Sequence, residues 1–171
     1  PWVIEDKLYS ALLLISGGEI AAVRLKHDLP NYGPFDEKRV FTAGPLPEPI
    51  LWRGISLGVP VCEDIWTPKV CAHLAAQGAE LFLVTNGSPY EYGKTNRREG
   101  IVSDRARESH APLVYLNQVG GQDELVFDGG VLIADATGKI VGRGPHWSEG
   151  VLTARFQKAA SGWSCPSAPQ T

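Results

Sequence analysis

The chain contains few cysteines and no methionine. Its 171 residues include three cysteines (Cys62, Cys71 and Cys165) and no methionine. An odd number of cysteines at these spacings forms no disulfide framework, and no Cys-x-x-Cys pair is available for zinc. We therefore expect reduced thiols in a cytoplasmic protein, one of which is free to be reactive. Because position 1 is not methionine, we also expect the natural start to precede the given sequence.

Other absences exclude whole classes of function. The longest apolar run, 11–15, is far shorter than the ~20 residues of a membrane helix. The net charge of −3, without long runs of one sign, argues against nucleic-acid binding, which needs a concentrated basic surface. The four histidines lack His-Glu-x-x-His spacing, so we expect no metal site. With 43% hydrophobic and 20% charged residues, the chain suits one globular domain with a buried core.

The apolar segments predict a mixed α/β layer fold. Runs at 8–15 and 20–25 flank Ser-Gly-Gly-Glu and predict a β-hairpin. A long loop follows at 26–49, and long ordered loops are often functional. Beyond it, short strands alternate with two helices, the first beginning at Thr67-Pro68. The expected elements are strand 55–61, helix 67–77, strand 81–84, helix 95–110, strand 113–119 interrupted by Gly120-Gly121, and a hairpin of 131–134 with 139–142.

Reactive and polar residues follow three of these strands. Cys62, Ser88 and Asn117 lie at or near C-terminal strand ends, where ligands gather in such folds. Cys62 also precedes the first helix, whose dipole and free N–H groups would favour a thiolate and hold an oxyanion. A free cysteine is equally often a plain core residue, so position alone leaves both interpretations open. Cys71, which shares a helix face with Val70, is expected in the core.

Two charged residues of the long loop are candidates for the same site. Lys26 precedes a rigid Leu-Pro-Asn-Tyr-Gly turn, and a lysine fixed near a thiol lowers the thiol pKa and stabilises an oxyanion. Glu37 lies in the mixed charge cluster 35–39. Taken alone, both are typical of solvated surface charges. A Cys–His pair would be another route to a nucleophile, but no pattern selects a histidine.

Four segments, in order, carry a family resemblance. They are Lys-His-Asp-Leu-Pro-Asn-Tyr-Gly at 26–33 with Phe-Asp-Glu at 35–37; Cys-Glu-Asp-Ile-Trp at 62–66; Asn-Gly-Ser-Pro-Tyr at 86–90 with Gly-Lys at 93–94; and Asn-Gln-Val-Gly-Gly-Gln-Asp-Glu-Leu-Val-Phe-Asp-Gly at 117–129. Together they resemble the nitrilase superfamily of carbon–nitrogen hydrolases, and in particular the glutaminase domain of bacterial glutamine-dependent NAD synthetases. The last segment is the most specific, and the resemblance extends over nearly the whole chain.

The resemblance implies an αββα four-layer sandwich and a Glu–Lys–Cys triad. Cys62 would attack the side-chain amide of glutamine, and Lys26 with the backbone N–H of Glu63 would hold the tetrahedral oxyanion. Ammonia would leave, and water would hydrolyse the glutamyl thioester.

The same match implies how the rest of glutamine would be bound. Glu63 suits its α-ammonium group and Lys94 suits its α-carboxylate, with Ser88 beside them. Tyr32 and Trp66 would form the walls of the pocket.

The match also implies an incomplete domain. The family's general base is a glutamate many tens of residues before the lysine, but only 25 residues precede Lys26, and neither Glu5 nor Glu19 lies in its context. We expect residues 1–158 to form the hydrolase domain, incomplete at the N-terminus by its first third, and 159–171 to form a linker toward an absent synthetase domain. ATP, Mg²⁺ and deamido-NAD would bind that absent domain. We expect no cofactor in this piece, which has no P-loop.

Three functions remain open at this point. The first is a glutaminase that supplies ammonia for the ATP-dependent amidation of deamido-NAD, working on glutamine in a cytoplasmic homo-oligomer. The second is a related amidase with another amide substrate. The third is a catalytically inactive scaffold, which the missing glutamate would favour. Ser88, Lys94 and the stretch 120–125 favour the first.

Overall fold

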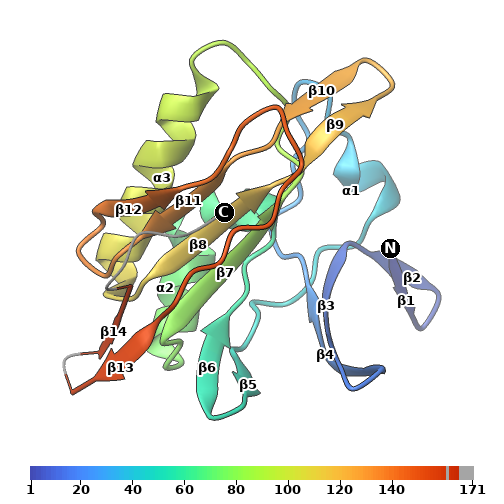
Figure 1. The fold of residues 1–171 in the computed structure, drawn as a ribbon. Coiled ribbons are helices and arrows are strands. Elements are labelled where there is room, and N and C mark those ends of the chain that lie inside the picture. Colours follow the sequence, from blue (N-terminus) through green and yellow to red (C-terminus); the bar gives the residue numbers. More distant parts are fainter. Residues whose placement is uncertain (161, 166–171) are drawn as a thin grey trace.

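A six-stranded mixed sheet forms the centre of the computed structural model, which describes residues 1–160 and 162–165 (Figure 1). The strand order is β12-β11-β8-β7-β6-β5. β6, β7 and β8 are parallel, while β5, β11 and β12 run antiparallel to their neighbours. The strands are β5 (Ile50–Trp52), β6 (Ile55–Gly58), β7 (Leu81–Asn86), β8 (Leu113–Asn117), β11 (Val131–Ala134) and β12 (Ile140–Arg143).

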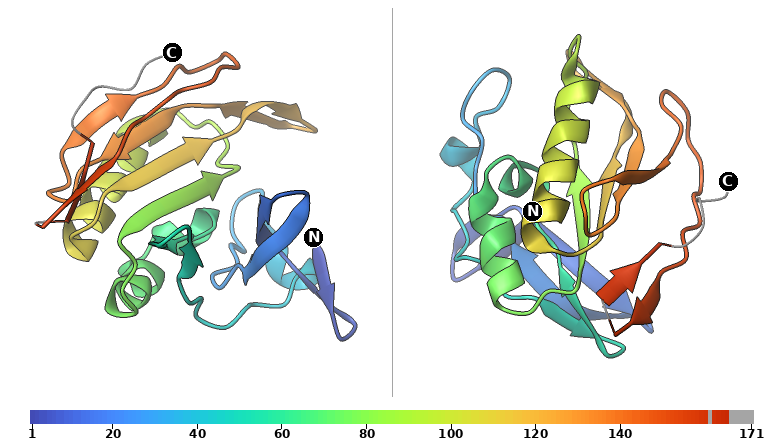
Figure 2. Two further views of the ribbon diagram at one scale, coloured as in Figure 1. Left: turned by 60° about the horizontal axis from the view of Figure 1, so that its bottom comes forward. Right: turned by 90° about the vertical axis from the view of Figure 1, so that its left-hand side faces the viewer.

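Helices α2 (Pro68–Ala76) and α3 (Lys94–Ser109) cover one face of this sheet (Figures 1 and 2). Both lie within one residue or so of their predicted positions. Thr67 is extended and Pro68 occupies the first helical turn, while Gly78, at φ +85°, follows the end of α2. The core beneath the helices includes Val70, Cys71, Leu74, Phe82, Val102, Ala106 and Leu113. Cys71 is 1% exposed, which confirms it as a core residue.

The predicted N-terminal hairpin is confirmed as β3 (Ala11–Ser16) and β4 (Glu19–Leu25), but Leu8 and Tyr9, expected in its first strand, lie in β2 (Lys7–Tyr9) and pair with β1 (Trp2–Ile4). Gly17 and Gly18 both have positive φ in its turn, as a two-residue hairpin loop requires. Its inward side chains, Leu12, Leu14 and Ala22, pack around a second core formed by Ile50, Leu57, Val59 and Leu81. Leu81 and Phe82 point to opposite faces of the sheet, because side chains alternate along a strand. Helices, central sheet and hairpin are thus successive layers of the expected sandwich.

Two strand predictions need correction. The strand expected at 55–61 ends at Gly58, and beyond it only a single bridge joins Val61 to Thr85; Pro60 has no N–H for a ladder. The strand expected at 113–119 ends at Asn117, and Gly120-Gly121 lie inside a new strand rather than interrupting the old one. That strand, β9 (Val119–Gln122), pairs with β10 (Leu125–Asp128) in a hairpin.

Smaller elements complete the described chain. The hairpin predicted around 135–138 is confirmed by β11 and β12, and the Asp135 carboxylate accepts the N–H groups of Thr137 and Lys139 in its turn. The remaining elements are β1 (Trp2–Ile4), β2 (Lys7–Tyr9), α1 (Glu37–Val40), the 3₁₀ turn η1 (Cys62–Ile65), β13 (Gln157–Ala159) and β14 (Gly162–Ser164).

The linker expected at 159–171 stays a prediction. Its described part contains β14, which pairs with β13, and residues 161 and 166–171 lie outside the described residues. Within residues 1–160 and 162–165, no helix has the length and apolarity needed to cross a membrane.

Candidate active site

Cys62 lies at the point where the chain leaves β6 and enters η1. Its φ of +50° is in the left-handed region, which residues other than glycine seldom adopt. The buried carboxylate of Asp64 holds this turn by accepting the N–H of Val61 at 3.0 Å. Its other oxygen accepts the N–H groups of His27 at 3.1 Å and Asp28 at 2.7 Å. One buried side chain therefore ties the cysteine turn to the segment that follows Lys26.

Lys26 is buried beside Cys62 and is not the surface charge that it resembles in isolation. Only 2% of Lys26 is exposed, and its Nζ lies 2.7 Å from both carboxylate oxygens of Glu37. Its backbone is also fixed, since its N–H donates to Ser10 and its carbonyl accepts from Gly44. Glu37 is likewise only partly exposed. A lysine held in this way remains a fixed positive charge within the site.

These three residues share one cavity of about 350 Å³. Lys26 and Glu37 come from the segment 26–49, Cys62 comes from η1, and the ends of β7 and β8 form a further part of the wall. The complete lining is Ser10, Lys26, Phe35, Glu37, Val61, Cys62, Thr85, Asn86, Gly87 and Gln118. Glu37 is the one carboxylate in this lining, and no histidine is part of it, as far as the described residues show. The cavity thus favours a Cys–Lys arrangement over a Cys–His pair.

The electrostatics around Cys62 are mixed. Burial raises the pKa of its thiol above the ordinary value, because it disfavours the charged thiolate. The positive charge of Lys26 and a hydrogen bond from the backbone N–H of Gly87 lower the pKa, while the negative charges of Glu37 and Glu63 raise it. The net effect is a raised pKa. A thiol with a raised pKa needs a base to become a thiolate at neutral pH.

Four of the five predicted substrate-binding residues lie in one group next to this turn. The hydroxyl of Tyr32 donates to the Glu63 carboxylate, with distances of 2.9 and 2.8 Å to its two oxygens. Burial, together with this hydrogen bond, raises the pKa of Tyr32. The ammonium of Lys94 lies 5.9 Å from the centre of the Trp66 ring.

Arg97 is a further member of this group that the sequence did not single out. Its guanidinium lies 4.6 Å from the centre of the Trp66 ring, a favourable cation–π distance. Lys94 also binds Glu91 at 2.5 Å. Two cations, Lys94 and Arg97, and two carboxylates, Glu63 and Glu91, therefore lie around two aromatic side chains, a mixture of charges that is suited to binding a zwitterion.

Ser88 is the predicted residue that the structure does not bring into this group. It is buried, and Arg98 donates to its hydroxyl from Nε at 3.2 Å and to its carbonyl at 2.7 Å. Arg98 is in turn paired with Asp128 at 2.7 Å. Neither Arg98 nor Asp128 was a candidate, because an arginine within a charged helix gives no sequence signal of burial. Glu37 did have a signal, since it lies in the Phe-Asp-Glu segment of the first motif.

Both ring nitrogens of His27, the histidine beside this site, form hydrogen bonds with other residues. His27 Nδ1 lies 2.8 Å from the carbonyl of Gly44, and its Nε2 lies 2.7 Å from Nζ of Lys69. A carbonyl only accepts, so Nδ1 carries the proton and Nε2 accepts from the lysine. Among residues 1–160 and 162–165, no group of three or more His, Cys, Asp or Glu is arranged to hold a metal ion.

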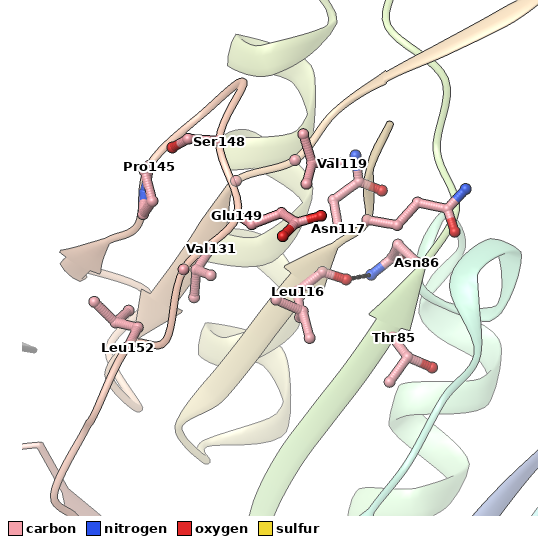
Figure 3. Close-up of a pocket in the computed structure, with 14 residues that line it drawn as sticks. Thr85, Asn86, Leu116, Asn117, Val119, Val131, Pro145, Ser148, Glu149 and Leu152 are labelled. Carbon is pink, nitrogen blue, oxygen red and sulfur yellow. Dashed lines mark hydrogen bonds between the residues drawn. The ribbon is translucent and has the colours of Figure 1, made fainter. Parts of the chain in front are cut away.

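A second cavity of about 310 Å³ adjoins the first (Figure 3). The two share Thr85, Asn86 and Gln118, and the walls of the second come from β7, β8, β11 and the segment 145–152. Its described lining contains no cysteine and no lysine. Of these two cavities, the Cys62 cavity is therefore the one that combines a thiol with a buried lysine.

Comparison with known proteins agrees with this geometry. Residues 2–163 match the carbon-nitrogen hydrolase family. A glutamine-dependent NAD(+) synthetase of Rhodobacter capsulatus is 41% identical over 163 residues, which are 95% of this chain and 30% of that protein. The structure of a glutamine-dependent NAD+ synthetase from Acinetobacter baumannii in complex with ADP superposes with a TM-score of 0.87 at 37% identity. It covers 96% of this chain and 32% of its own, so the chain spans about a third of such relatives.

An amidase among the similar structures has a covalent adduct on its own active site cysteine. A variant of an amidase from Nesterenkonia sp. AN1 shows covalent addition of the acetamide moiety of fluoroacetamide at the active site cysteine. It is 34% identical, with a TM-score of 0.63, and the match covers 75% of this chain and 47% of the amidase. The family indicated by the four sequence segments is therefore confirmed. The chain has a nitrilase-type α/β fold and belongs to the carbon–nitrogen hydrolase family.

Proposed function

We propose that this chain is the glutamine-hydrolysing part of a glutamine-dependent NAD synthetase, with Cys62 as its nucleophile. The observation that carries the proposal is the buried Lys26, held by Glu37 at 2.7 Å in the cavity that Cys62 lines. A buried ammonium is costly unless it is paired, so its presence beside a thiol suggests a catalytic use. The NAD synthetase relatives and the match to the hydrolase family support the same function.

The reaction would begin with the thiolate of Cys62 attacking the side-chain amide carbon of glutamine. Negative charge then develops on the amide oxygen, and Lys26 with the backbone N–H of Glu63 would stabilise it. The C–N bond breaks, the amide nitrogen takes up the proton that the thiol lost and leaves as ammonia, and a glutamyl thioester remains on Cys62. Water then adds to the thioester carbonyl, releases glutamate and restores the thiol.

Glu37 would position Lys26 in this reaction. Both of its carboxylate oxygens lie 2.7 Å from the Lys26 ammonium, so the carboxylate is turned toward Lys26. By fixing the ammonium, Glu37 keeps a positive charge where the oxyanion forms, before any substrate is bound. For this reason we propose that Glu37 acts by positioning Lys26 and not as a base for the thiol.

Substrate choice would follow from the group beside Cys62. Glu63 would bind the α-ammonium of glutamine and Lys94 its α-carboxylate, between the side chains of Tyr32 and Trp66. Ser88 has the least support, because contact between its hydroxyl and a substrate would require the hydroxyl to leave Arg98.

In the longer protein, ammonia from this site would serve the ATP-dependent amidation of deamido-NAD to NAD. A synthetase domain would bind ATP, Mg²⁺ and deamido-NAD. The names of the relatives and the share of their length that this chain spans support this wider role. We further propose a cytoplasmic homo-oligomer.

The test is covalent labelling with a glutamine-mimicking diazo-ketone, followed by intact mass and peptide mapping. We expect one adduct, on Cys62, which excess glutamine suppresses and the Cys62→Ala substitution removes. Cys71 and Cys165 serve as internal controls. Equal labelling of all three cysteines would refute a built glutamine site. Suppression by small aliphatic amides but not by glutamine would instead favour an amidase with another substrate.

A further inference from the structure

A buried ion pair lies behind the loop that forms one wall of the Cys62 cavity. Arg98 is 3% exposed and Asp128 is 1% exposed, and Nη1 of Arg98 lies 2.7 and 2.8 Å from the two carboxylate oxygens. Such a pair is expensive to bury and is a weak source of stability by itself. The remaining donors of Arg98 all bind the loop after β7: Nη2 donates to the carbonyls of Ser88 at 2.7 Å and Pro89 at 2.9 Å.

Ser88 is held from a second side by Asn117. The amide oxygen of Asn117 accepts the Ser88 N–H at 2.8 Å, and its amide nitrogen donates to the Ser88 carbonyl at 3.0 Å. Both residues are buried. The peptide groups on either side of Ser88 therefore have fixed orientations, and Arg98 contributes a planar fork that a flexible lysine would not reproduce.

The residue immediately before this clamp faces the nucleophile. Gly87 lines the same cavity as Cys62, and its backbone N–H donates a hydrogen bond to the thiol. A fixed N–H aimed at sulfur favours the thiolate over the thiol. The charged groups that act on Cys62 come from other segments: Lys26, Glu37 and Glu63. Two further titratable groups, Tyr32 and Tyr115, lie near enough for the charge of Cys62 to raise their pKa.

We propose that Arg98, fixed by Asp128, is a positioning residue for the nucleophile: by binding the Ser88 and Pro89 carbonyls it aims the Gly87 N–H at Cys62. Arg98 does not touch the substrate and acts through three residues of backbone. This role rests on the proposed function, since it supposes that Cys62 reacts as a thiolate.

The test measures the rate of Cys62 alkylation by iodoacetamide across pH, with site-resolved mass spectrometry. Arg98→Lys keeps the charge facing Asp128 but loses the fork to the two carbonyls. We expect the inflection of the alkylation profile to move up by about one pH unit, with a roughly tenfold lower rate at neutral pH. Cys71 and Cys165 report any general loosening of the chain in the same sample.

Arg105→Lys is the matched control. Arg105 is a second buried arginine of α3 and binds Glu108 at 3.1 Å, but it acts on Cys71 and not on Cys62. Its substitution should leave the Cys62 profile unchanged. A purely structural role of Arg98 would make both variants alike. An unchanged Cys62 profile in folded Arg98→Lys would overturn the proposal.

Two further measurements cover other outcomes. If Arg98→Lys fails to fold, Asp128→Glu, which keeps the charge but moves the carboxylate, must shift the profile in the same direction by less. If Asp128→Glu also fails to fold, the NMR resonance of the Gly87 amide is measured in the native chain. This resonance must shift when Cys62 is alkylated, and an unchanged resonance would reject the contact between the Gly87 N–H and Cys62. If glutamine does not protect Cys62 of the native chain from alkylation, the proposed function is contradicted. If glutamine does protect Cys62 but the alkylation profile of Arg98→Lys is unchanged, only the role of Arg98 is contradicted.

Discussion

Replacing Glu37 by glutamine is the most direct perturbation of the proposed site. The substitution keeps the size of the side chain and removes the negative charge that lies 2.7 Å from Nζ of the buried Lys26. At an effective dielectric constant of about 20, the attraction across that distance is ~6 kcal/mol, and desolvation offsets much of it. Breaking a buried pair costs roughly 3–5 kcal/mol. Because the Glu37 side chain is 21% exposed, we expect a loss of about 2–3 kcal/mol in the free energy of unfolding.

The substitution should also slow the reaction of Cys62, by an amount similar in free energy to the loss of stability. A catalytic group displaced by about 1 Å, or an oxyanion donor removed, costs on the order of 10²-fold in rate. We therefore expect the diazo-ketone to label Cys62 roughly 10²-fold more slowly in Glu37→Gln, at a temperature where the variant remains folded. Chemical denaturation measures stability and mass spectrometry measures labelling.

The matched control is Asp36→Asn, which removes the neighbouring carboxylate. Asp36 is paired with Arg39 at 2.5 Å on the surface, and both side chains are more than half exposed. Exposed pairs contribute roughly 0–1 kcal/mol, so both stability and labelling should stay close to those of the native chain. If Glu37→Gln were as stable and as reactive as Asp36→Asn, the assignment of Glu37 as the residue that holds Lys26 would be wrong.

Three further substitutions test other parts of the structure. Burial raises the pKa of Cys71 from 9.0 to about 12, so the folded state favours the protonated thiol. The resulting contribution to the free energy of unfolding is complete below pH 9. It is lost as the pH rises toward 12, by up to ~1.4 kcal/mol per pH unit. Urea titrations at alkaline pH should show this decline in the free energy of unfolding for the native chain and a smaller decline for Cys71→Val. Equal dependence of the two free energies on pH would contradict the burial argument. Tyr32→Phe removes the hydroxyl that binds Glu63, and roughly tenfold more glutamine should then be needed to protect Cys62 from labelling; unchanged protection would remove Tyr32 from the substrate group. Gly58→Ala places a methyl group 2.8 Å from the ring of Phe82, and thermal unfolding should reveal a loss of about 1–3 kcal/mol, with Gly100→Ala, where no atom lies within 4 Å, as the control that loses none.

Local sequence patterns predicted the elements whose ends are set by special residues. The glycines at 17 and 18 mark the first hairpin, and Thr67-Pro68 with Gly78 mark the limits of α2. The end of β6 was misjudged because apolar character continues through Val59 and Val61 although the ladder stops at Gly58. Hydrophobicity reports burial, and here burial continues after strand pairing has ended.

The charged residues of the site could not be placed from local patterns. Lys26 meets Glu37 across 11 positions, and Arg98 meets Asp128 across 30. A charged residue considered alone is predicted to be exposed to solvent. Its burial is tolerable only when a partner of opposite charge lies beside it in the fold. The family resemblance gave Lys26 a role before the fold was known, but neither the resemblance nor periodicity distinguished Arg98 from its exposed neighbour Arg97.

In the proposed reaction, the two buried ion pairs would have different roles at Cys62. Lys26 with Glu37 would supply a fixed positive charge on one side of the cavity, whereas Arg98 with Asp128, which lies outside the lining, would orient a neutral N–H. A second bare cation in the lining would depress the thiol pKa further but would also bind competing anions. A backbone donor is smaller, carries no net charge and cannot be displaced by salt in the way that an ion pair can. The proposed arrangement would therefore provide one cation for the oxyanion and one dipole for the thiolate. The cation is paired with Glu37, and the arginine that would orient the dipole is paired with Asp128.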